Sequence, residues 1–176
     1  MIIQDKVSKQ DWIKLYGVLS HIENFDATAF VKDMKYEIGQ LKFFYNNVTR
    51  NQTGNPSTSF YKPKIKPESH QLAYFNLTQG FPKELRGGHW CYVLKHVKSK
   101  FIIIPCTSVK DDSSIPDPEY QMDIEIDGFP NGKKARLQFS DIRAVDAQRL
   151  YVDRGIYDIV TERGRIVNSA LEAIYE

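Results

Sequence analysis

Two neighbouring stretches of the chain decide its predicted fold: KELRGGHWCYVL at residues 83–94 and FIIIPCTSV at residues 101–109. Both contain apolar runs rich in β-branched and aromatic residues, which predict strands at residues 90–95 and 101–106, and the short polar segment between the runs predicts an antiparallel pair. Such a pair brings Cys91 near Cys106, so the loop before Trp90 lies beside Thr107. Acidic, basic and hydroxyl side chains therefore gather at one end of two paired strands.

Three more short apolar or alternating runs predict strands at residues 72–77, 122–126 and 135–139, and the turn-rich segment DGFPNGKK connects the last two. A final helix is expected over residues 164–175, with Ile166, Val167, Ala170, Leu171 and Ile174 on one face. Strands at this spacing predict a mostly β fold with α, in which residues 69–176 form a small, strongly bent antiparallel barrel with a C-terminal helix.

Residues 1–50 predict a helical extension in front of the barrel. Ser8 and Asp11 resemble a capping box with Asp in place of Glu or Gln, and a second helix is expected after Asp26. The second helix carries an apolar seam with members three and four residues apart: Val31, Met34, Ile38, Leu41, Tyr45 and Val48. We expect this seam to be buried against a neighbouring helix or the domain behind it. The alternative is an oligomer or partner interface.

The charge of the chain is unevenly placed. The 176 residues carry a net charge of +2, with 41% hydrophobic and 26% charged residues, which is ordinary for a soluble globular protein. Residues 51–110, however, hold nine basic and two acidic side chains. A basic surface of this kind suits a polyanion, although a solvated face is the simpler alternative. Within this segment, residues 51–68 are rich in Gly, Pro, Ser, Thr and Lys and predict a linker or exposed loop.

Cysteine content and apolar runs indicate the cellular setting. Cys91 and Cys106 both fall in predicted strands, and two cysteines imply no disulfide framework, so we expect reduced core thiols. The first residues lack the apolar run of a signal peptide, and no segment approaches eighteen apolar residues. We therefore expect a cytoplasmic protein without a membrane partner.

Three motifs in order carry a family resemblance: ELRGGHW at residues 84–90, IPCT at residues 104–107 and LQFSDIRAVDAQRL at residues 137–150. From His70 onward the chain resembles the MazF/PemK (Kid) family of endoribonuclease toxins of type II toxin–antitoxin systems. The resemblance implies an SH3-like barrel, usually a homodimer, that cleaves single-stranded RNA, typically mRNA, without metal or other cofactor. It also implies a cognate antitoxin that covers the RNA groove. The extension before the barrel lies outside the resemblance.

The expected catalytic residues are Arg86, His89, Thr107 and Glu84, gathered at one end of the barrel. RNA cleavage through the 2′-hydroxyl needs proton transfer, stabilisation of extra charge on phosphorus and in-line positioning. Arginine binds phosphate in a bidentate manner, histidine exchanges protons near neutral pH, and a threonine hydroxyl can donate to a phosphate oxygen. Glu84 is either a base or a group that fixes the loop. The expected RNA-binding residues are Lys83, Gly87, Gly88, Ser108, Asn76 and Lys110.

One position departs from the family pattern. The catalytic arginine of the family falls at position 89, which is histidine here, and an arginine stands three residues earlier, at Arg86. Either the two residues share the chemistry, or one of them carries it, or the activity is lost. Other functions remain open: a non-catalytic RNA- or protein-binding barrel, and a gyrase poison like the CcdB family. The Trp-Gly-Ile ending of that family contrasts with LEAIYE at residues 171–176.

Several residues also have structural interpretations. Trp90 is expected in the barrel core rather than as a base-stacking platform, and Arg143, Asp146 and Arg149 are expected to form a structural ion-pair set. The four histidines and two cysteines show no zinc-type spacing, so no metal site is predicted.

Overall fold

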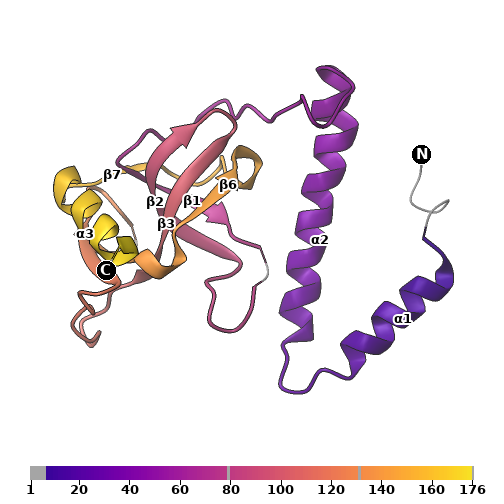
Figure 1. Cartoon of the computed structure of the whole chain (residues 1–176), viewed down its shortest axis with the longest axis horizontal. Helices are drawn as coiled ribbons and strands as arrows, with labels where there is room; N and C mark the ends of the chain where they lie inside the picture. Colours follow the sequence, from indigo (N-terminus) through magenta and orange to yellow (C-terminus); the bar gives the residue numbers. More distant parts are fainter. Residues whose placement is uncertain (1–6, 79, 131, 176) are drawn as a thin grey trace.

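The computed structural model describes residues 7–78, 80–130 and 132–175, and consists of a curled sheet with one packed helix and a two-helix arm that extends from it (Figure 1). The strands are β1 (Gln71–Asn76), β2 (Gly88–Val97), β3 (Lys100–Ser108), β4 (Gln121–Glu125), β5 (Lys134–Gln138), β6 (Arg143–Asp146) and β7 (Tyr157–Asp158). The helices are α1 (Lys9–Ser20), α2 (Ala27–Phe43) and α3 (Arg163–Tyr175). A π-helical turn, η2 (Phe44–Thr49), continues α2, and two 3₁₀ turns, η3 (Phe139–Asp141) and η4 (Ala147–Arg149), flank β6.

The described strands form one antiparallel sheet in the order β4-β5-β3-β2-β1-β7, and β6 pairs with β3 off this path. The two ends of the path approach each other. Ile126 and Ile159 form a bridge, and the Val160 N–H donates to the Glu125 carbonyl at 2.9 Å. The fold is therefore mixed α and β, with an antiparallel sheet that is curled into a half-barrel, called the barrel below, and a C-terminal helix. The five predicted strands and the final helix are confirmed to within two residues at each end, whereas β6 and β7 were not predicted.

Strand β3 changes partner halfway along its length. Its first half pairs with β6 as far as Ile103, and its second half pairs with β5 from Cys106 onward. Pro105 lies between these two sets of pairs. Because proline has no N–H to donate, a position where the strand changes partner is one that tolerates it. The sheet bends at this point.

Both faces of the central strands are buried, in two separate clusters. One cluster lies beneath α3 and includes Leu72, Tyr92, Ile104, Leu137 and Ile166. The other lies against β6 and η4 and includes Phe75, Val93, Phe101, Ile103 and Leu150. Alternation along the strands sends neighbouring side chains to opposite clusters. No described helix is long and apolar enough to cross a membrane.

The two cysteines are free and buried, as predicted, and they belong to different clusters. Burial raises the pKa of the Cys91 thiol well above its ordinary value and raises that of Cys106 to about 12. Both thiols are therefore protonated at physiological pH and unsuited to nucleophilic chemistry.

The predicted starts of the arm helices are confirmed. The Ser8 hydroxyl accepts from the Asp11 N–H at 3.2 Å, and the Asp11 carboxylate accepts from the Ser8 N–H at 3.0 Å. Hydrogen bonds from Ser8 lower the pKa of Asp11. The Asp26 carboxylate caps α2 by accepting from the Ala29 N–H at 2.9 Å. Residues 52–70 contain turns but no helix or strand, as expected of a connecting segment.

The expectation that the seam packs against the barrel is wrong. Val31, Ile38, Leu41 and Tyr45 are 40%, 51%, 51% and 54% exposed, and of the seam only Val48 is buried. The reason is that α2 presents a different face to the barrel.

The barrel-facing side of α2 is polar and aromatic. Tyr36 stacks on Tyr151 with ring centroids 5.2 Å apart, and burial raises the pKa of Tyr36. The next residue, Glu37, and Gln40 one turn later bond to side chains of η4. These contacts hold the helix beside the barrel while its apolar seam faces away.

Burial of α3 generates a stability prediction. Ile166 is fully buried, whereas Ile174 on the same helix is 55% exposed. Ile166→Ala should lower the free energy of unfolding by about 2–5 kcal/mol, because it removes buried methyl groups and leaves a cavity. Ile174→Ala, the matched control, should change it by less than about 1 kcal/mol. Chemical denaturation followed by tryptophan fluorescence measures both, and equal effects would contradict this packing of α3.

Candidate functional site

His89 and Thr107 lie side by side, as the strand pairing predicted. In the β2–β3 pair Cys91 is opposite Pro105, so the residues before Cys91 approach those after Pro105. The Nδ1 atom of His89 is 3.3 Å from the Cys106 carbonyl oxygen. Both side chains are half-buried and lie at the end of their strands. The two residues form the centre of what we call the His89–Thr107 site.

The surroundings of His89 select its tautomer. A carbonyl oxygen can only accept a hydrogen bond, so a neutral His89 in this position carries its proton on Nδ1. Its Nε2 atom then has a free lone pair. A ring nitrogen in this state can accept a proton from a substrate hydroxyl.

Thr107 ends a chain of hydrogen bonds with a single direction. The Asp117 N–H donates to Gln121 Oε1 at 3.1 Å, which turns the Gln121 amide group toward Gln138 Oε1, also at 3.1 Å. The Nε2 of Gln138 then donates to Thr107 Oγ1 at 3.0 Å. Because the chain starts at a backbone N–H, which cannot accept, every donor in it points the same way. The Thr107 hydroxyl proton is left to donate to another group.

An ion pair beside the site connects it to the loop between β1 and β2. Arg143 Nη2 is 2.7 Å from Asp141 Oδ1, and the same carboxylate oxygen accepts from the Leu85 N–H at 3.2 Å. Arg143 also opposes the rise in the pKa of Cys91, which places its charge near the strand that carries His89. The loop is therefore anchored to η3 and β6.

The expected ion-pair set of Arg143, Asp146 and Arg149 is wrong in its partners. Arg143 pairs with Asp141, Arg149 pairs with Glu37 of α2 at 3.2 Å, and Asp146 accepts from the Gln148 N–H at 2.8 Å.

A different ion pair, missed by sequence reasoning, has its arginine buried beside Thr107. Arg136 is 7% exposed, bonds Asp123 at 2.6 Å and donates to the Ser114 carbonyl, so it fixes the loop before β4.

Glu84 fixes the β1–β2 loop. Its Oε2 accepts from the Phe81 N–H at 2.9 Å, within the same turn of the loop. Arg86 is exposed and, within the described ranges, makes no hydrogen bond or ion pair. The pairing of β2 with β3 thus places His89 near Thr107, but no contact among the described residues links Arg86 or Glu84 to either. Their convergence stays a prediction.

The two glycines of the loop have structural roles. Gly87 has φ +72, a left-handed backbone that favours glycine, and its N–H and carbonyl group close the loop on Thr78 and Leu77. A Cβ on Gly88 would overlap the ring of Tyr74. Trp90 packs edge-on against the same ring, with centroids 5.2 Å apart. Trp90 is partly buried against the first core cluster, in agreement with the core interpretation.

The remaining predicted RNA-binding residues are dispersed. Lys83, Ser108 and Lys110 are exposed. Asn76 is 5% exposed, and its Oδ1 accepts from the Thr78 N–H at 2.8 Å. Asn76 also lines a pocket on the other side of β1, between α2 and the barrel.

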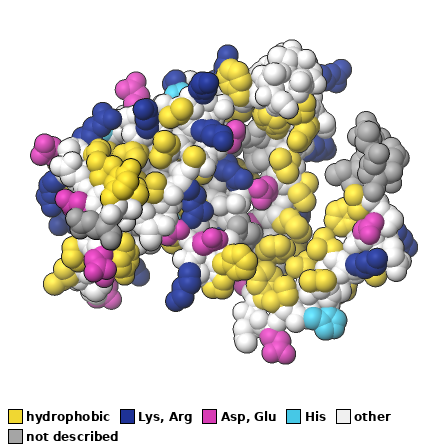
Figure 2. Space-filling view, viewed as in Figure 1, with side chains coloured by type: hydrophobic (Ala, Val, Ile, Leu, Met, Phe, Trp, Pro, Cys, Tyr) yellow, Lys and Arg dark blue, Asp and Glu magenta, His cyan; other side chains and the backbone are white. Residues whose placement is uncertain are grey.

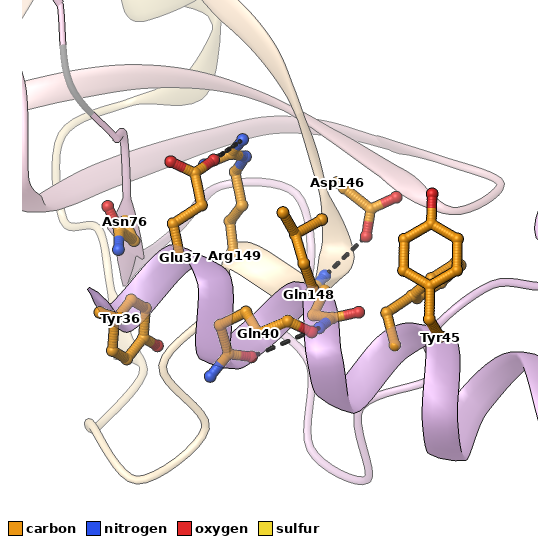
Figure 3. Close-up of a pocket in the computed structure, with 10 residues that line it drawn as sticks. Tyr36, Glu37, Gln40, Tyr45, Asn76, Asp146, Gln148 and Arg149 are labelled. Carbon is orange, nitrogen blue, oxygen red and sulfur yellow. Dashed lines mark hydrogen bonds and ion pairs between the residues drawn. The ribbon is translucent and has the colours of Figure 1, made fainter. Parts of the chain in front are cut away.

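This pocket shares no lining residue with the His89–Thr107 site. It has a volume of about 230 Å³ and is walled by side chains of α2, η2 and η4 (Figure 3). Two polar pairs in its wall are already bonded: Glu37 with Arg149, and Gln40 with Gln148. The lining residues are Tyr36, Glu37, Gln40, Leu41, Phe44, Tyr45, Asn76, Asp146, Gln148 and Arg149.

The described residues include no cluster of three or more His, Cys, Asp or Glu that could hold a metal ion. Comparison of the chain with protein-family models and with curated proteins gives no match.

Contact between Gly88 and Tyr74 yields a prediction. Gly88→Ala should lower the free energy of unfolding by about 1–3 kcal/mol, because the new methyl group must displace the Tyr74 ring. In a Tyr74→Leu background the same substitution should cost much less, since the ring is gone. Unfolding of the four proteins of this double-mutant cycle measures the coupling. Additive effects of the two substitutions would mean that the glycine serves another purpose.

Proposed function

We propose that the chain is an endoribonuclease that cleaves single-stranded RNA by attack of the 2′-hydroxyl on the adjacent phosphorus, without a metal ion. The observation that carries this proposal is the adjacency of a free imidazole nitrogen at His89 and an oriented hydroxyl donor at Thr107. A proton acceptor and a hydrogen-bond donor are the groups that such a cleavage needs at one phosphate.

The geometry supports the following roles. His89 Nε2 takes the proton of the 2′-hydroxyl, and the O2′–P bond forms as the P–O5′ bond breaks. The Thr107 hydroxyl donates to a non-bridging phosphate oxygen. His89, protonated by the first transfer, can return a proton to the leaving 5′-oxygen. The products are an RNA with a 2′,3′-cyclic phosphate and an RNA with a 5′-hydroxyl.

Two arginines could stabilise the charge that develops on the phosphate, and their surroundings distinguish them. Arg143 is already paired with Asp141 at 2.7 Å, so its charge is partly compensated. Arg86 is exposed and makes no ion pair within the described residues, so its guanidinium can take a phosphate. The basic character of residues 51–110 favours the same ligand.

The biological setting of the proposal rests on the resemblance to the MazF/PemK (Kid) family. On that basis the chain is the SH3-like, homodimeric toxin of a type II toxin–antitoxin system, with mRNA as substrate and a cognate antitoxin as partner in the cytoplasm.

The proposal is tested by incubating the purified chain with a long single-stranded RNA in EDTA and mapping the ends. We expect discrete cleavage with 5′-hydroxyl ends that polynucleotide kinase can label directly. Intact RNA at micromolar protein, with RNA retained in a binding assay, would indicate a non-catalytic RNA-binding barrel. Cleavage only with added magnesium would contradict the side-chain mechanism.

The departure at position 89 makes the pH profile informative. An imidazole changes its protonation state between about pH 5 and 8, whereas a guanidinium stays charged. The cleavage rate should bend within this window, and His89→Ala should remove the bend together with roughly 10²- to 10⁴-fold of rate. Arg86→Ala should lower the rate at every pH of the window, because it removes a phosphate contact and no titrating group.

His96→Ala is the matched control, because His96 lies in the same strand and stacks on Phe101. The pH profile of the His96→Ala variant should keep the bend of the wild type. A flat wild-type profile with full activity in His89→Ala would place the chemistry on Arg86 and Thr107 alone.

A further inference from the structure

The arm, defined as α1, α2, the turn between them and η2, leaves a large apolar surface in water. Its exposed large side chains are Trp12, Ile13, Leu15, Tyr16, Val18, Ile22, Val31, Ile38, Leu41, Phe43 and Tyr45, which are between 40% and 74% exposed. The four aromatic groups, about half exposed, leave roughly 400 Å² in water, and the seven aliphatic groups add roughly 300 Å², so the total is roughly 700 Å². The largest apolar patch of a typical monomer is only about 300–600 Å².

Apolar side chains surround much of α1. Ile13, Tyr16 and Val18 are 53%, 74% and 66% exposed and do not share one face of the helix. None of the residues of α1 is buried. A soluble helix that is apolar on several sides is normally surrounded by other helices. The neighbouring α2 alone does not cover it.

Both helices of the arm carry the same kind of seam. In α1, Trp12, Leu15, Leu19 and Ile22 repeat the three–four spacing that Val31 to Val48 follow in α2. Such seams pack on helices with the same spacing, knobs into holes. Figure 2 shows hydrophobic side chains along the length of α2 and over the side of α1 that faces it, around an open hollow.

The barrel of the same chain does not fill this hollow. It meets α2 through the other face of the helix, by the Tyr36–Tyr151 stack and the Glu37–Arg149 ion pair. Leu41 and Tyr45, at the edge of the seam, also line the pocket between α2 and the barrel, yet both Ile38 and Leu41 remain half exposed.

The charge of the arm favours self-association over a charged partner. From Lys9 to Phe43 the sequence holds five lysines and five acidic residues. Two copies therefore meet without net repulsion. A nucleic acid, an acidic protein or an anionic lipid surface would gain no net attraction from this segment.

We propose that two copies of the chain associate through their arms, with the seams of α1 and α2 from each copy packed into a common helical bundle. The available apolar surface of roughly 700 Å² per copy is close to the roughly 800 Å² per partner of a standard stable interface. A twofold arrangement lets each copy cover the other with the same residues. Ile38 and Leu41 lie in the middle of the α2 seam and become buried. This interface belongs to the arm and does not depend on the nuclease chemistry.

The test compares the full chain with two double variants of α2. Ile38→Glu/Leu41→Glu places two charges in the seam, whereas Thr28→Glu/Lys32→Glu places two at exposed positions of α2 outside it. By sedimentation equilibrium near 10 µM, the wild type and the second variant should have twice the 20.4 kDa chain mass. The seam variant should have the single-chain mass, with self-association weakened roughly 100-fold or more. Circular dichroism checks that its helices persist.

A second measurement avoids added charge. Cys91 and Cys106 are buried, so a single cysteine introduced by Leu41→Cys reports on its own surroundings. Its alkylation rate should fall at least about tenfold as the chain concentration rises through the dimerisation range. The rate for Lys32→Cys should stay constant.

Three outcomes would overturn the proposal. The first is a wild-type chain that stays monomeric with a reactive thiol at position 41. The second is a seam variant as dimeric as the wild type, which would assign the contact to another surface such as the barrel. The third is a monomer that sediments with anionic phospholipid vesicles, which would make the arm a membrane-surface element.

Discussion

Strand β3 must pair with β2 along one edge and with two different strands in succession along the other. β6 takes the first half of this second edge and β5 takes the second half. The change of partner falls at Pro105, and the two faces of the curled sheet lie over separate core clusters. The end of β3 that carries Thr107 then lies beside β5, which brings Gln138 to the threonine hydroxyl. The fold and the site thus depend on the same divided strand.

The site is only partly preorganised. The His89 ring and the Thr107 hydroxyl are oriented by the protein itself, because the Cys106 carbonyl orients His89 and a chain of amides orients Thr107. Hydrogen bonds in such a chain polarise one another, which strengthens the last donor. The group best suited to hold a phosphate, Arg86, lies on a loop that is anchored just before it, by Glu84 to the Phe81 N–H and by Asp141 to the Leu85 N–H. In the proposed reaction the substrate phosphate completes the arrangement.

Local patterns predicted the strands well because alternation of apolar residues is a property of each segment. β6 and β7 were not predicted, because they have only four and two residues, too few to show the alternation of a strand. The adjacency of His89 and Thr107 followed from one hairpin. The partners of Thr107 and Arg149 could not be predicted in this way. Gln138 lies 31 residues from Thr107, and Glu37 lies 112 residues from Arg149. Periodicity also showed that the seam of α2 is apolar, but no local pattern states which surface covers it.

Closure of the sheet by β7 has a consequence for synthesis of the chain. β1 pairs with β7, so Gln71 can pair only after Asp158 has been synthesised. In the same way, the first core cluster is complete only after Ile166 of α3 has been synthesised. Long-range pairings of this kind form late, whereas helices form as soon as they emerge. The arm is therefore complete on the ribosome while the barrel is still open. Any activity that depends on the closed sheet begins only after β7 and α3 have left the ribosome. Synthesis of the chain and the start of its activity are therefore separated in time.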